Sequence, residues 1–66
     1  MNEEKKHEIE RLVVDYYNKT MRYKALGMMN MPSDQEEAKK WTTEYFLAQK
    51  EMIEADHALK ASVDEL

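Results

Sequence analysis

The stretch from residue 38 to residue 66, AKKWTTEYFLAQKEMIEADHALKASVDEL, decides the fold. Its apolar and small residues recur at alternating intervals of three and four without a break, which places them along one side of an α-helix. This is the spacing of the a and d positions of a coiled coil, and the small residues let a neighbouring helix approach closely. The seam consists of Ala38, Trp41, Tyr45, Ala48, Met52, Ala55, Leu59, Ser62 and Leu66.

The helix that carries this seam is expected to cover residues 34–64. Pro32 disfavours a helical conformation at the residue before it. Ser33 and Glu36 have the spacing of a capping box, in which each side chain satisfies a free backbone amide of the first turn. No residue inside the segment breaks a helix, so we expect it to be continuous.

The preceding sequence predicts a shorter helix over residues 3–26 and a turn at residues 27–32. The shorter helix begins with acidic residues, which complement the positive end of the helix dipole. Asp15 and Lys19 form a favourable pair four residues apart. Gly27 supplies the left-handed residue that commonly ends a helix. The predicted fold class is therefore all-α, an antiparallel two-helix hairpin that forms a single domain over residues 1–66.

Both helices carry more apolar surface than one neighbour can cover. Beside the seam, Phe46 and Ile53 form a further stripe seven residues apart. The shorter helix has one stripe at Ile9, Leu12, Tyr16, Tyr23 and Leu26, interrupted by Lys19 and widened by Val13, and a second at Val14, Tyr17, Met21, Ala25 and Met28. A 66-residue chain without cysteine has a small interior and no disulfide to stabilise it. We therefore expect two hairpins to pair as a homodimeric four-helix bundle.

Aromatic residues are favoured anchors of protein interfaces because they bury a large area at little entropic cost. Trp41 and Tyr45 are expected to lie in the core, whereas Tyr17, Phe46 and Ile53 are expected to contact a second chain. The full set predicted for the interface with a partner or a second copy is Tyr17, Trp41, Tyr45, Phe46, Ala48, Met52, Ile53, Ala55 and Leu59.

The predicted turn is rich in methionine, with Met28, Met29 and Met31 within four residues. Three interpretations are open for this turn contact. The side chains plug the open end of the bundle, they adapt to a partner surface, or their thioethers bind a soft ion such as Cu(I).

Two Glu-x-x-His motifs, Glu4 with His7 and Glu54 with His57, have the spacing of ligands in di-metal helical bundles. In a hairpin that turns near Asn30 the two motifs would lie at the same level. All four residues, however, fall outside the apolar seams, whereas such sites project into the bundle. We therefore expect no cofactor, and these four residues are the candidates for a metal site.

The net charge of −4 makes nucleic acid an improbable partner. Residues 1–26 hold six bases and five acids, or +1, whereas residues 33–66 hold four bases and nine acids, or −5. Helices of opposite charge attract when packed side by side, so the asymmetry is interpreted either as complementarity within the hairpin or as a signal for a partner. A nucleic-acid-binding regulator that uses the shorter helix is the alternative, through Lys5, Lys6, Arg11, Lys19, Arg22 and Lys24.

Enzyme chemistry is not expected, because neither Ser33 nor Ser62 lies in a nucleophile motif and no glycine-rich loop could hold a phosphate. The sequence shows no signal peptide and no apolar run near the roughly 18 residues of a membrane span, so a cytoplasmic protein is expected. The predicted function is a small protein-interaction module, a homodimeric stoichiometric regulator or adaptor that could also engage a larger protein. In a variant of this hypothesis, the longer helix alone docks into a groove of its target.

Overall fold

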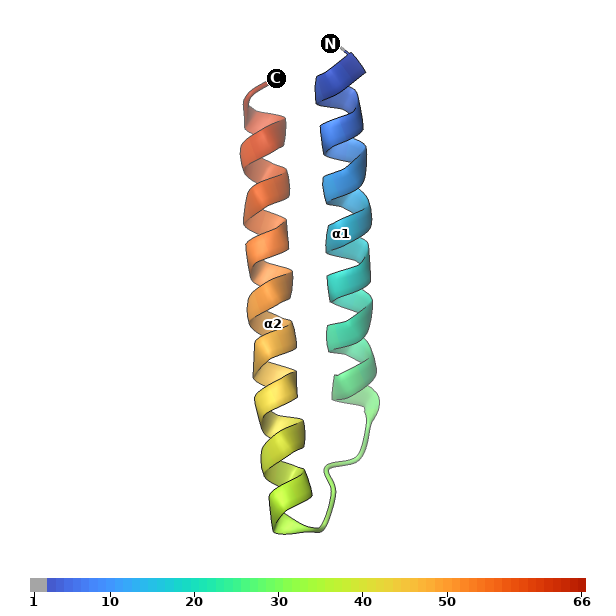
Figure 1. The fold of residues 1–66 in the computed structure, drawn as a ribbon, viewed down its shortest axis with the longest axis vertical. Coiled ribbons are helices and arrows are strands. Elements are labelled where there is room, and N and C mark those ends of the chain that lie inside the picture. The colour runs from blue at the N-terminus through green and yellow to red at the C-terminus, as the bar shows by residue number, and fades with distance from the viewer. Residues whose placement is uncertain (1–2) are drawn as a thin grey trace.

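The computed structural model describes residues 3–66 as two antiparallel helices that lie side by side (Figure 1). Helix α1 covers Glu3–Met28 and helix α2 covers Gln35–Asp64, and residues 29–34 connect them. The start of α1 and the C-terminus lie together at the end opposite this connection. The Cα atoms span 52 × 14 × 13 Å, so the hairpin is a rod. Residues 3–66 contain no strand, which confirms the predicted all-helical hairpin.

The end of α1 differs from the prediction, because the helix continues through Gly27. No described glycine has a positive φ, so the expected left-handed cap at Gly27 is wrong. The carbonyl of Leu26 accepts the backbone N–H of Met29 at 3.3 Å and the indole N–H of Trp41 at 3.2 Å. The side chain of Trp41 thus satisfies a carbonyl at the end of α1. In many helices a backbone N–H that follows a left-handed residue satisfies such a carbonyl.

The start of α2 is capped one residue later than predicted. The N-cap is Asp34, whose backbone is extended (φ −73°, ψ 133°). Its carboxylate accepts a hydrogen bond of 3.1 Å from the backbone N–H of Glu37. The expected capping box of Ser33 and Glu36 is therefore wrong. Asp34 stands three residues before Glu37, so the same spacing occurs twice in succession. A carboxylate caps as well as a hydroxyl does and also meets the positive end of the helix.

The seam of α2 packs against the first apolar stripe of α1. The small residues Ala48, Ala55 and Ser62 are buried, and Ala48 is only 1% exposed. The larger seam residues are half-buried, and Leu66 is exposed beyond the end of α2. Facing them, the half-buried positions of α1 include Ile9, Leu12, Tyr16, Lys19, Tyr23 and Leu26.

Contacts between the helices set their register. These contacts are Lys5 with Glu65, Arg22 with Glu51, and Tyr23 with Tyr45. His7 consequently lies near the level of Ser62, more than one helical turn from the level of His57. The expectation that the two Glu-x-x-His motifs share a level is wrong, because residues 29–34 run beyond the end of α1 before α2 begins (Figure 1).

Candidate interaction face

Four aromatic rings form a cluster near the connection. Trp41 and Tyr45 are stacked, with ring centroids 5.2 Å apart, and Tyr23 lies 5.0 Å from Tyr45. The hydroxyl groups of Tyr23 and Tyr45 share a hydrogen bond of 3.0 Å, which together with burial raises the pKa of Tyr45. Phe46 packs its edge on Tyr45 at 5.6 Å yet is 58% exposed. The cluster therefore extends from the helix contact to the surface.

The ion pair of Arg22 with Glu51, at 3.1 Å, bridges the two helices on one side of the hairpin. Successive residues of an α-helix are about 100° apart, so residues roughly 140–180° around each helix from this pair lie on the opposite side. We call that opposite surface the Phe46 face. It consists of Val13, Tyr17 and Thr20 from α1 and Phe46, Gln49 and Ile53 from α2.

The Phe46 face is apolar and largely uncovered. Val13, Phe46 and Ile53 are exposed, and Tyr17 is 62% exposed. Between them lie the half-buried Thr20 and Gln49. The hydroxyl oxygen of Thr20 is buried and has no hydrogen-bond partner among the residues that the structure describes. The opposite side, which carries the ion pair, is charged. The positions seven or fourteen residues from Arg22 and Glu51 include Glu8, Asp15, Glu44 and Glu65.

The predicted interface set divides into two groups. Trp41, Tyr45, Ala48, Met52, Ala55 and Leu59 lie between the two helices of one chain, where they are buried or half-buried. Tyr17, Phe46 and Ile53 are the members that remain exposed, and they lie on the Phe46 face. Spacing in the sequence found these three residues, but their presence on one face follows from the helix register.

The rest of the second stripe of α1 lies farther around the helix. Val14, Met21 and Met28 are seven residues apart and exposed, and they face away from α2. Met28 is 85% exposed, and Met29 and Met31 in the connection are also exposed. The methionines of the turn thus do not plug the end of a single hairpin.

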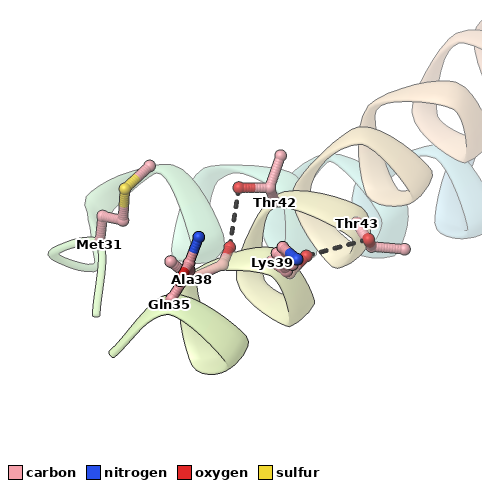
Figure 2. A pocket seen from close by; sticks show the side chains of 6 residues that line it. All are labelled: Met31, Gln35, Ala38, Lys39, Thr42 and Thr43. Carbon is pink, nitrogen blue, oxygen red and sulfur yellow. Dashed lines mark hydrogen bonds between the residues drawn. The ribbon is translucent and has the colours of Figure 1, made fainter. Parts of the chain in front are cut away.

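An open depression of about 540 Å³ lies where α2 extends past the end of α1 (Figure 2). The hydroxyls of Thr42 and Thr43 donate to the carbonyls of Ala38 at 2.8 Å and Lys39 at 2.9 Å. Both hydroxyls are therefore occupied within α2. The sequence analysis did not identify this depression, which is lined by Met31, Gln35, Ala38, Lys39, Thr42 and Thr43.

The structure does not bring the metal candidates together. Glu4, His7, Glu54 and His57 are all exposed. His7 lies 3.8 Å from Glu3 and 3.7 Å from Glu10, which belong to its own helix. Residues 3–66 contain no group of three or more His, Asp or Glu side chains that could hold a metal ion.

The basic residues of α1 lie among acidic partners. Lys19 lies 3.5 Å from Asp15, confirming the predicted pair, and Arg22 contacts Glu51 of α2. Lys5 pairs with Glu65 of α2 and lies 3.6 Å from Glu8. Two of the bases of α1, Lys5 and Arg22, thus contact acidic residues of α2, and Lys19 contacts an acidic residue of its own helix.

Comparison of the chain with protein-family models, with curated proteins and with solved structures gave no match. Over the described residues, neither helix has an apolar segment long enough to cross a membrane. The interpretation of the Phe46 face therefore rests on the geometry of this chain.

Proposed function

We propose that the chain is a non-enzymatic protein-interaction module that pairs with a second copy of itself through the Phe46 face and forms a four-helix bundle. The supporting observation is the exposure of Tyr17, Phe46 and Ile53 on one side of the rod. Burying a large apolar side chain is worth roughly 1.5–3 kcal/mol, and about half of that gain is still available for side chains exposed to this degree. A second copy recovers it twice, because a twofold pair uses the same surface on both chains.

The size of the face also supports pairing. The rod is 52 Å long. Two adjacent helices, each about 10 Å across, therefore present a side of about 1,000 Å², of which the Phe46 face is the central part. Stable protein interfaces bury about 800 Å² on each partner. A contact that starts from the Phe46 face and continues along most of that side of the rod would meet that value.

The proposed mode of action is stoichiometric. The depression of about 540 Å³ is open, and its two threonine hydroxyls are bonded to α2 itself. An enzyme site needs groups that are free to react and a surrounding that excludes water. A paired hairpin instead acts by occupying the surface of a partner, as a regulator or adaptor. A cysteine-free chain suits the cytoplasm, which we propose as its location.

Light scattering coupled to size exclusion tests the pairing at micromolar concentration, with Phe46→Asp compared with Leu47→Asp. Leu47 is the neighbouring residue, is 45% exposed and lies on the side of the ion pair, so the two variants carry the same added charge. We expect a dimer for the wild type and for Leu47→Asp, and at least a tenfold weaker dimer for Phe46→Asp.

Because Phe46 also contacts Tyr45, Ile53→Asp serves as a second variant, and circular dichroism checks that each variant stays helical. A wild-type protein that remains monomeric at every concentration contradicts the proposal. An equal loss of dimer in Leu47→Asp and Phe46→Asp also contradicts it.

A further inference from the structure

We infer that the two copies pair turn to turn, with their connections at the same end and α1 of each copy packed against α2 of the other. This inference rests on the proposed pairing through the Phe46 face and adds its orientation. It also places the two methionine-rich connections side by side, at one end of the assembly.

Twofold symmetry leaves two simple orientations for this face. If the axis runs along the helices, the connections meet and α1 of one copy lies over α2 of the other. If the axis runs across the helices, the connections lie at opposite ends, α1 lies over α1 and α2 lies over α2. Neighbouring helices are antiparallel in both cases, so the helix dipoles do not choose between them.

The charges of the two helices favour the first orientation. The segment with α1 carries +1 and the segment with α2 carries −5. The crossed orientation places the two acidic α2 helices next to each other, so their net charges repel across the bundle, although Glu44, Glu51 and Glu65 lie on the side away from the Phe46 face. The turn-to-turn orientation places each α2 between two α1 helices. Contacts of this kind already exist within one hairpin, where Arg22 pairs with Glu51 and Lys5 with Glu65.

The register of the hairpin gives compatible pairings in this orientation. With the axis along the helices, residues at equal levels of the two copies meet, because the symmetry allows no sliding. Lys5 lies at the level of Glu65 in each hairpin. Counting along α1 and back along α2 from that contact sets Tyr17 near the level of Ile53 of the other copy, and the Tyr23–Tyr45 contact gives a level within one helical turn of this. The same count sets Glu10 against Lys60 and Lys24 against Phe46, an ion pair and a cation–π contact.

Distance measurement between spin labels tests the orientation. The chain contains no cysteine, so Asn30→Cys and Glu4→Cys each introduce one labelling site, in the connection and at the opposite end. Both positions are exposed. Turn-to-turn pairing predicts distances between copies that are much shorter than the 52 Å rod for both variants. Crossed pairing predicts distances approaching the length of the rod for both.

Long distances in both variants would overturn the orientation and leave the pairing intact. The absence of any distance between copies, together with a monomeric mass, would overturn the proposed function as well. Adding Phe46→Asp to each labelled variant is the control, and it should abolish the signal between copies.

Discussion

Gly27 lies in the last turn of α1, close to the aromatic cluster. A Cβ atom at this position would stand 3.4 Å from Cε2 of Tyr45, which is an ordinary van der Waals contact. Glycine so near a predicted helix end suggested a left-handed cap. The structure instead has a helical Gly27, with the Leu26 carbonyl bonded to Trp41. The hydrogen bond from Trp41 of α2 thus takes the place of the expected local cap. The spacing of residues within α1 does not predict this contact between helices.

Replacing Gly27 by alanine is expected to stabilise the hairpin by roughly 0.5–1 kcal/mol, because alanine loses less conformational entropy on entering a helix. Urea denaturation followed by circular dichroism measures the change. A left-handed Gly27 would give the opposite sign, since alanine is strained there. A clear loss of stability would therefore contradict the helical conformation.

At the scale of elements, the seam predicted most of the structure. The three–four spacing predicted the longer helix and its buried side, because burial imposes this period on any packed helix. The shorter helix carries two apolar stripes, and the structure shows which of them meets α2. The exact start of α2 was not predictable, since Ser33 and Asp34 both stand three residues before a glutamate. The level of His7 relative to His57 depends on the path of residues 29–34, and the periodicity of the helices does not predict that path.

Substitution at the start of α2 shows whether Asp34 or Ser33 caps the helix. Asp34→Ala removes the acceptor of the Glu37 N–H and is expected to lower the free energy of unfolding by about 1 kcal/mol. Ser33→Ala is the matched control and should change it by much less. Thermal denaturation of both variants gives the comparison. A larger loss in Ser33→Ala than in Asp34→Ala would restore the capping box that the sequence suggested.

For the molecule as a whole, the ends of the two helices are joined by charge. The pair of Lys5 with Glu65 lies at the end of the rod opposite the connection (Figure 1). Its hydrogen bond and its charge lower the pKa of Glu65 and raise that of Lys5. The stabilisation by Glu65 is therefore present at neutral pH and is lost as the pH falls through its lowered pKa. The contribution of Lys5 is present below its ordinary pKa of 10.5 and is lost as the pH rises through its raised value.

An NMR titration of the Glu65 carboxyl tests this pairing. The pKa should lie below the ordinary 4.5 in the wild type and return toward 4.5 in Lys5→Met, because the neighbouring cation is gone. Lys6→Met removes the same charge from an exposed neighbour and should leave the Glu65 titration unchanged. Identical curves for wild type and Lys5→Met would show that the two ends are not joined in solution.

The candidate face was predictable only in part at this scale. The sequence predicted Tyr17, Phe46 and Ile53 as contacts with a second chain, because they fall on stripes outside the main seam, and all three are exposed in the hairpin. Whether residues of two helices lie on the same side of a hairpin depends on how each helix is rotated about its axis. The ion pair of Arg22 with Glu51 defines that rotation, and helix periodicity alone does not. The six other predicted interface residues pack between α1 and α2 of the same chain, because the nearest apolar surface available to the seam is the other helix of the hairpin.

Trp41 is the only tryptophan in the sequence, and its indole N–H binds the last turn of α1 across the hairpin junction. Its fluorescence therefore reports on one defined place, without any added dye. Separation of the helices at the junction would release the indole to water and shift the emission to longer wavelength. Stopped-flow recording of that shift would show whether the junction opens before the rest of the rod or together with it.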